Sequence, residues 1–347
     1  MGSTPAGAVR ISRRAIGVLV LAGAALLPAA PAAGAGDDRP LFRFKDARIT
    51  ESSGLAVSPT HDGIVYTHND SGDGPRIFAV GEDGRTRATF TIGGATARDW
   101  EGMAASVDPA TGRGVLWIAD IGDNLDGAWP YVTVYKVTEP RAMRDATLPA
   151  TAYRLRYEGG GRNAEGVMVN PRTGRLYVVS KEMSGSVYEA PARLSTNRVN
   201  VLRKVGPAPI MATDAAYAPD GSGFVIRTYF SASVYSAPGK LIAHVTMPPL
   251  QQAESISYTR DGTALLTGSE GADSPVYRVP LPPEARGRPA SPSARPQAAK
   301  PSGRPSPHAS RAEGAPGGVP LSMTLLWLGV AVGAIGVIAA VAYRTGR

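Results

Sequence analysis

The sequence predicts an all-β fold built from repeated groups of strands. A short pattern recurs in which a β-branched residue and an aromatic residue are followed by any residue and then by Val or Ala. A Gly-containing turn precedes each copy, and no long stretch of helical periodicity lies between residues 39 and 280. Self-similarity of this kind indicates stacked structural repeats. The copies of the pattern are residues 77–80, 134–137, 187–190, 234–237 and 276–279.

Each repeat contains the signals of four strands. A first strand leads into an Asx or Gly turn, a buried strand follows, and a polar loop separates it from an amphipathic strand and an outer strand. The aromatic residues of the pattern recur every 42 to 57 residues, which is close to the length of one propeller blade. We therefore expect a β-propeller of about five four-stranded blades. Six blades are possible if residues 140–149 are not an insertion, and a β-sandwich is the main structural alternative.

The last repeat lacks an outer strand after Val279. Residues 41–44, which precede the first repeat, alternate between apolar and polar side chains with a period of two. An open sheet edge needs a partner. We therefore predict that this N-terminal strand completes the last blade and closes the ring.

The N-terminus has the order of regions found in a secretory signal peptide, predicted over residues 1–36. Arg10, Arg13 and Arg14 precede an apolar run at 15–27, and residues 33–35 offer an A-x-A-like cleavage site. The apolar run is too short to span a bilayer comfortably. The arginine pair fits both an ordinary signal and a twin-arginine signal, so the export route stays open.

A second apolar segment lies near the C-terminus. Residues 321–342 carry no charge and are long enough to cross a bilayer as a helix. We expect a transmembrane helix over 319–343 and a cytoplasmic tail over 344–347. Residues 281–318 are rich in Pro, Ser, Ala and Arg and cannot form a core, which predicts a stalk. The expected protein is a single-pass membrane protein whose propeller, residues 37–280, is extracellular.

The charge of the chain does not indicate nucleic-acid binding. The formal net charge is +8, but residues 37–280 contain 26 Lys and Arg residues against 27 Asp and Glu residues. The excess lies in the terminal segments, so the predicted domain has no basic footprint. The sequence has no Cys, which excludes a thiolate metal site and a Cys nucleophile. It also contains no G-x-S-x-G and no H-E-x-x-H motif.

Four carboxylates share one position in the predicted first strands of the blades. They are Glu101, Glu165, Asp214 and Glu254. First strands line the channel of a propeller, so these side chains should converge and raise one another's pKa unless a cation compensates. A hard cation such as Ca²⁺ suits a ring of oxygen ligands. The alternative is that these acids accept hydrogen bonds from backbone amides of neighbouring blades.

Further polar residues lie in the loops at the same end of the predicted blades. We expect them to line a ligand site, with Lys181 and Arg227 as possible counter-charges for the acids. Trp100 offers either an exposed platform or a side chain buried between blades. The loop residues are Asn69, Asp70, Asp99, Trp100, Asp120, Asp123 and Asn124.

Four segments carry a resemblance to known proteins: residues 53–56, 69–72, 99–104 and 119–124. Together they resemble secreted or membrane-anchored actinobacterial β-propeller proteins of the WD40-like type. More distantly, the sequence is similar to the gluconolactonase, paraoxonase and phytase-like propellers. That resemblance implies acidic and Asn residues around a central calcium ion.

These observations lead to two functional hypotheses. The first is a cell-surface binding ectodomain whose ligand is an extracellular protein, a glycan or a small molecule. The alternative is a Ca²⁺-dependent propeller hydrolase acting on lactones or phosphoesters, in which the cation polarises the substrate or activates water. A structural role in the cell envelope is a third possibility.

Overall fold

The computed structural model describes residues 39–125 and 127–286, and this part of the chain is all-β. Its only helical element is one short 3-10 helix, η1 (Pro283–Ala285). The described residues contain no helix that is long and apolar enough to cross a membrane. The predicted signal peptide, the transmembrane segment, the cytoplasmic tail and most of the stalk lie outside the described residues.

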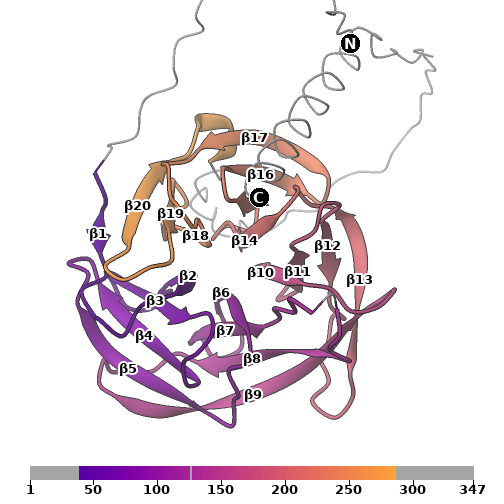
Figure 1. Ribbon diagram of the computed structural model, residues 1–347, viewed down its shortest axis with the longest axis horizontal. Helices are drawn as coiled ribbons and strands as arrows, with labels where there is room; N and C mark the ends of the chain where they lie inside the picture. Colours follow the sequence, from indigo (N-terminus) through magenta and orange to yellow (C-terminus); the bar gives the residue numbers. More distant parts are fainter. Residues whose placement is uncertain (1–38, 126, 287–347) are drawn as a thin grey trace, which may run out of the picture. The chain divides into compact units, whose positions relative to one another are not determined.

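The strands form five antiparallel units of four strands each (Figure 1). Units 1 and 2 are β2 (Ser52–Val57), β3 (Ile64–Asn69), β4 (Arg76–Gly81) and β5 (Thr86–Gly93), then β6 (Trp100–Val107), β7 (Gly114–Asp120), β8 (Val132–Thr138) and β9 (Ala146–Tyr157). Units 3 and 4 are β10 (Ala164–Val169), β11 (Leu176–Ser180), β12 (Ser186–Glu189) and β13 (Asn200–Pro207), then β14 (Ala212–Tyr217), β15 (Phe224–Thr228), β16 (Ser231–Ala237) and β17 (Lys240–Thr246). Unit 5 is β18 (Ser255–Tyr258), β19 (Ala264–Gly268), β20 (Pro275–Pro280) and β1 (Phe42–Arg43).

Strand β1 pairs with β20 in antiparallel register, with Phe42 opposite Val276. The N-terminal strand therefore completes the last unit, as the sequence predicted. Parallel pairing of β9 with β5 and with β13 also joins the outer strands of the first three units. The long strand β9 includes residues 146–149, part of the segment considered as an insertion.

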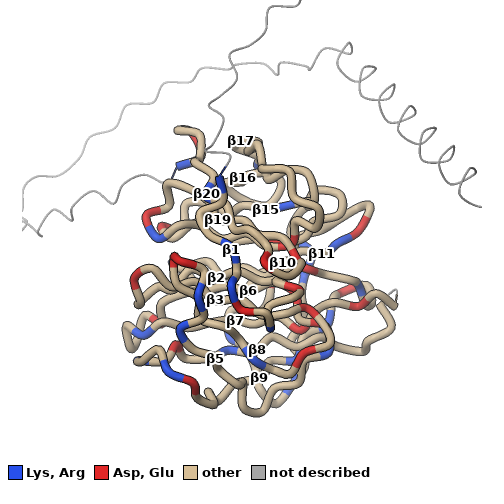
Figure 2. Tube along the Cα trace, turned by 60° about the vertical axis from the view of Figure 1, so that its left-hand side comes forward, with Lys and Arg blue, Asp and Glu red and all other residues tan. Residues whose placement is uncertain are grey.

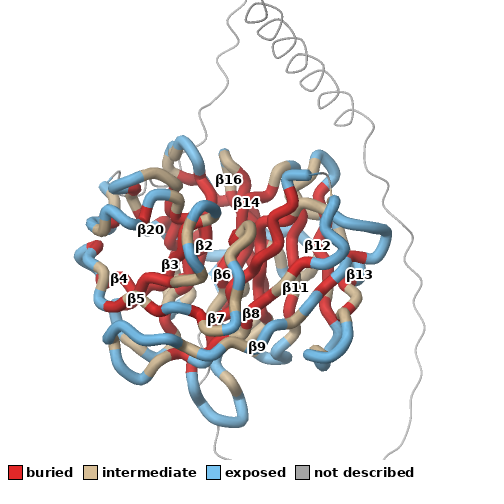
Figure 3. The backbone as a smooth tube through the Cα atoms, turned by 60° about the horizontal axis from the view of Figure 1, so that its bottom comes forward, coloured by how far each residue is buried: buried red, intermediate tan, exposed pale blue. Residues whose placement is uncertain are grey.

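Hydrophobic residues of neighbouring units pack against each other in five clusters of the described chain. The clusters join unit 1 to 2, 2 to 3, 3 to 4, 4 to 5, and 5 back to 1. The first strands β2, β6, β10, β14 and β18 are neighbours in the same cyclic order. They lie at the centre of the arrangement and are mostly buried, whereas exposure is concentrated in the loops (Figures 1 and 3).

Each first strand is joined to its second strand by a turn that the sequence predicted. Side-chain oxygens of Asp108, Asn170, Asp220 and Asp261 accept hydrogen bonds from backbone N–H groups two residues later, and Ser58 accepts one three residues later. A glycine with φ between 66° and 68° ends each turn, a conformation that favours Gly. These five turns, at 58–63, 108–113, 170–175, 218–223 and 259–263, define the turn rim. The opposite end of the units, where second strands lead into third strands, is the loop rim.

Both ends of the described chain leave from the turn rim. Strand β1 enters from it, and after β20 the Leu281 N–H bonds to the carbonyl oxygen of Thr263 in the fifth turn. Packing continues beyond the predicted domain end at residue 280, because Leu281 and Ala285 are buried in the cluster between units 4 and 5.

Candidate functional site

The predicted site residues gather at the loop rim, around the first strands. Glu101 and Glu165 are the second residues of β6 and β10, Asp214 is the third residue of β14, and Glu254 directly precedes β18. The second strands contribute Asp120 and Arg227 near their ends, and Asp70 and Lys181 directly after them. The surface as a whole mixes blue and red segments, with no continuous basic face in view (Figure 2).

The pairing of first and second strands is irregular at this level. The register shifts between Ser52 and Leu55, between Trp100 and Met103, between Ala164 and Gly166, and between Ala212 and Asp214. Bulges of this kind turn side chains out of the regular alternation of a strand. In unit 2 the shift spans the position of Glu101.

Small residues follow the carboxylates because neighbouring first strands approach closely. A Cβ atom on Gly102 would lie 2.7 Å from the Glu165 carbonyl oxygen and 2.8 Å from the Val167 nitrogen. The same position holds Gly54, Gly166, Ala215 and Ser255 in the other units. This column of small residues was a sequence signal for the close approach of backbones.

Asp70, Asp99 and Glu101 form the tightest acidic cluster of the described residues. One oxygen from each carboxylate lies within 4.8 Å of an oxygen of the other two. Glu101 is 4% exposed, and the Oδ1 atom of Asp70 is buried with no hydrogen-bond partner among the described residues. The three side chains come from the end of β3, the connection before β6, and β6 itself.

The electrostatics of this cluster favour a positive charge. Burial, and then the nearby charge of Asp99, raise the pKa of Asp70 to about 8. Burial also raises the pKa of Asp99, and burial followed by the charge of Glu165 raises the pKa of Glu101 well above its usual range. Without a compensating cation, the cluster holds protons at neutral pH.

Lys181 neutralises the neighbouring Glu165 rather than the cluster. Its Nζ atom lies 2.8 Å from Oε1 of Glu165, and both side chains are largely buried. Although burial opposes it, the charges of Glu165 and Glu254 raise the pKa of Lys181. The predicted role of Lys181 as a counter-charge is therefore confirmed.

The other two members of the predicted ring, Asp214 and Glu254, have different partners. Asp214 accepts hydrogen bonds from the N–H groups of Ala215 (2.7 Å) and of Ile256 (2.8 Å) in the next unit. This is the alternative role considered for the acids, a bond between neighbouring units. The Oε2 atom of Glu254 has no partner in the described chain, and burial raises the pKa of this residue to about 7.

Arg227 is fully buried beside these acids. Its Nε atom donates to the Ala253 carbonyl oxygen at 3.3 Å, whereas Nη1 and Nη2 find no acceptor within the described residues. Burial lowers its pKa to about 10, and the charges of Asp214 and Glu254 oppose this shift. Arg227 is thus a buried cation on the side of the hub opposite to Asp70 in the order of the units.

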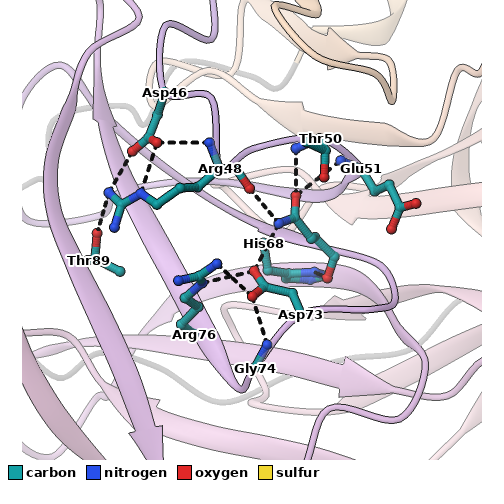
Figure 4. A network of polar contacts seen from close by, with 10 residues as sticks. Asp46, Arg48, Thr50, Glu51, His68, Asp73, Gly74, Arg76 and Thr89 are labelled. Atoms are coloured by element: carbon teal, nitrogen blue, oxygen red, sulfur yellow. Dashed lines mark hydrogen bonds and ion pairs between the residues drawn. The ribbon is translucent and has the colours of Figure 1, made fainter.

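Several predicted ligand residues instead hold the loops in place. Asn69 accepts from the N–H groups of Thr50 and Glu51 and donates to Arg48 and Asp73, so its amide is fully used (Figure 4 shows the surrounding network). The other members are Asp120, which accepts from the Asp99 N–H, Asp123, which accepts from the Trp129 N–H, and the exposed Asn124, which accepts from Asn163.

Trp100 is buried and is not an exposed platform. It is 1% exposed, its Nε1 atom donates to the Thr96 carbonyl oxygen, and its ring meets the edge of His68 at 5.4 Å. Trp129, in contrast, is 38% exposed and carries the guanidinium of Arg98 over its ring at 4.3 Å. Burial lowers the pKa of His68 to about 4, so this imidazole is neutral at physiological pH.

Tyr229, Glu270 and Arg98 belong to the site but were missed by sequence reasoning. Tyr229 lies under the ammonium group of Lys181, with 5.1 Å between Nζ and the ring centroid. Burial and the charge of Glu51 raise the pKa of Glu270. A signal for Tyr229 existed in the Tyr229-Phe230 pair, because Phe230 is 90% exposed in a tight hairpin at the loop rim.

The spacing of Asp70, Asp99 and Glu101 fits a calcium ion. Calcium–oxygen distances of 2.3–2.6 Å place oxygens on opposite sides of the ion about 5 Å apart, and adjacent ones closer. The 4.8 Å limit within the cluster agrees with this spacing. Of the four residues predicted as metal ligands, only Glu101 belongs to the cluster, whereas Asp70 and Asp99 were expected to bind ligand.

No model of a known protein family matches the chain, and no curated protein matches it in sequence.

Proposed function

We propose that the chain is a five-bladed β-propeller in which each unit is one blade. The cyclic order of the five hydrophobic clusters and the pairing of β1 with β20 support this assignment. In such a ring the first strands surround a common axis. The loop-rim acids are then the residues that meet at the axial mouth.

The proposed location is the cell surface, with a single C-terminal membrane anchor. The signal-like N-terminus and the apolar segment at 321–342 support it. Both ends of the described chain leave from the turn rim. The loop rim, which carries the acidic cluster, would then point away from the membrane and toward extracellular ligands.

The proposed activity is calcium-mediated binding of an extracellular ligand at the loop rim. The observation that carries it is the cluster of Asp70, Asp99 and Glu101, with its unpartnered Oδ1 atom on Asp70. Glu165 adds a fourth carboxylate but is already paired with Lys181. Calcium takes six to eight oxygen ligands, so three carboxylates leave positions for oxygens of a glycan, a carboxylate or a phosphate.

Thermal unfolding with Ca²⁺ and with EDTA tests the cation site. At 100 times its dissociation constant, a bound ion stabilises the folded protein by about 2.7 kcal/mol. For a domain of this size, that corresponds to a rise in Tm of roughly 5–10 °C. Glu101→Gln should remove the rise, whereas Glu82→Gln, at an exposed carboxylate away from the hub, should keep it.

A rise in Tm that survives Glu101→Gln and Asp70→Asn would reject this cluster as the site. The extracellular ligand can then be sought on a glycan array with the Ca²⁺-loaded protein. Retention that EDTA does not reverse would reject a role for calcium in ligand binding.

One observation favours the hydrolase as a second candidate. The carboxyl group of Glu254 has an unpartnered oxygen and a pKa of about 7, the range in which a general acid or base is most effective. Lys181 and Arg227 nearby could hold an anionic group. Chromogenic lactones and phosphoesters test this candidate. Turnover that requires Ca²⁺ and falls at least about 100-fold in Glu254→Gln would support it, and the absence of turnover would leave the binding function alone.

A further inference from the structure

A pocket lies on the turn rim, at the opposite end of the units from the acidic cluster. Its volume is about 130 Å³, and all five units contribute to its lining through the ends of their first strands. Val107, at 45% exposure, stands at its edge. Neither the proposed cation site nor the proposed ligand binding uses this pocket.

The lining is apolar and aromatic. Pro59, Pro171 and Pro219 come from three of the turns, and Tyr217 and Tyr258 come from the ends of β14 and β18. The one charged lining residue, Arg260, already donates to the carbonyl oxygens of Ser58 and His61. The pocket therefore offers rings and aliphatic groups rather than charge.

Tyr258 adds an unused hydrogen-bond donor to this lining. Its side chain is 4% exposed, and its hydroxyl group has no partner among the described residues. A buried hydroxyl without a partner is costly. A ligand that brings a carbonyl oxygen to Tyr258 would remove this cost.

A polyproline II segment has the matching chemistry. Its backbone makes no internal hydrogen bonds, so its carbonyl oxygens are free to accept, and its proline rings pack into aromatic-lined grooves. Residues 289–296 of this chain read Pro-Ala-Ser-Pro-Ser-Ala-Arg-Pro, which includes a P-x-x-P motif. The segment begins three residues after Arg286, the last residue described.

The position of Arg286 puts this segment within reach. Helix η1 packs against β17, the outer strand of unit 4, and the chain has just left the turn rim. An outer strand lies three strand spacings, about 14 Å, from the first strand of its unit. Ten residues of polyproline II span about 31 Å, so the segment can cover this distance.

We propose that residues 289–296 bind in the turn-rim pocket of the same chain, with Tyr258 donating to one of their carbonyl oxygens. The contact ties the proposed stalk to the base of the domain. It thereby fixes how the domain stands on its anchor.

Engineered disulfides test this proposal, because the chain has no cysteine of its own. The purified full-length protein carries Val107→Cys together with Pro292→Cys. The matched control carries Thr111→Cys together with Pro292→Cys. Thr111 lies four residues further along the same turn and is exposed, but it does not line the pocket. The rate of disulfide formation within one chain is measured under mild oxidation by mobility on non-reducing gels.

Binding in the pocket predicts that the Val107 pair oxidises at least about tenfold faster than the Thr111 pair, because docking raises the local concentration of residue 292. Tyr258→Phe, which removes only the hydroxyl, should lower the rate of the Val107 pair toward that of the control. Equal rates in the two pairs would overturn the proposal. Disulfides that form only between copies would overturn the assignment to the same chain.

Discussion

At the scale of single residues, the carboxyl group of Asp70 carries most of the chemistry of the site. Its Oδ1 atom is buried without a partner, and burial beside Asp99 raises its pKa to about 8. A proton and a cation therefore compete for the same group. The stability of the cation-free protein should report this competition.

We predict that the Tm of the protein in EDTA falls as the pH rises from 6.5 to 9. The pKa of Asp70 is about 8 in the folded state and near 3.8 in the unfolded state, and that of Glu254 is about 7 against 4.5. The folded state therefore binds more protons than the unfolded state in this window, and stability is lost as these protons leave. His68 acts in the opposite direction only between about pH 4 and 6.5, where the unfolded state binds its proton.

Excess Ca²⁺ should reduce this fall, because the cation replaces the proton. Asp70→Asn should also reduce it, because the amide carries no titrating charge. Differential scanning calorimetry at several pH values measures both effects. A Tm in EDTA that stays constant or rises over this window would contradict the electrostatics described for the cluster.

Asp214 separates a structural acid from a metal ligand. Asp214→Ala leaves the N–H groups of Ala215 and Ile256 without acceptors and removes a carboxylate beside the buried Arg227. We expect a loss of roughly 2–4 kcal/mol in the free energy of unfolding, measured with urea. The rise in Tm caused by Ca²⁺ should persist. Loss of that rise in a folded Asp214→Ala variant would place Asp214 among the ligands instead.

At the scale of elements, the strands and turns follow from local chemistry, and much of this could be predicted. The Asx side chains and glycines of the five turns satisfy their own backbone, so Asp108 and Gly112 indicate a turn without knowledge of the rest of the fold. The pairing of β1 with β20 was predictable, because the last repeat lacked a strand and residues 41–44 could supply one.

The membership of the acidic cluster could not be predicted in the same way. Alignment of the repeats placed Glu101 and Asp214 at one level, but the register shifts of β6 and β14 give them different partners. Asp70 follows a second strand, and its proximity to Asp99 depends on how units 1 and 2 pack. Long-range packing decides these contacts, and a repeat pattern does not encode them.

The close approach of first strands gives a prediction at this scale. Gly102→Ala would put a Cβ atom 2.7 Å from a backbone oxygen of β10, and backbone cannot move aside cheaply. We expect a loss of roughly 3 kcal/mol in the free energy of unfolding. Gly74→Ala is the matched control, since no atom lies within 4 Å of the added Cβ, and it should change stability by less than about 0.5 kcal/mol. Equal effects of the two substitutions in urea denaturation would refute tight packing at the hub.

At the scale of the whole molecule, the two rims differ in chemistry. The loop rim carries Asp70, Asp99 and Glu101, whereas the turn rim carries an apolar pocket and both ends of the described chain. This division gives each rim a separate proposed role, with ligand binding at one end and attachment at the other. The acidic cluster is the part of this account on which the proposed function depends.

Isothermal titration calorimetry of the purified full-length protein with Ca²⁺ tests that cluster most directly. Titrations at pH 7 in two buffers with different ionisation enthalpies yield both the number of ions and the number of protons released. We predict one ion per chain and the release of about one proton, because Asp70 is mostly protonated at this pH. Glu101→Gln should abolish the binding heat, whereas Glu82→Gln should retain it. No binding by the unmodified protein, or binding that survives Glu101→Gln without proton release, would contradict the account.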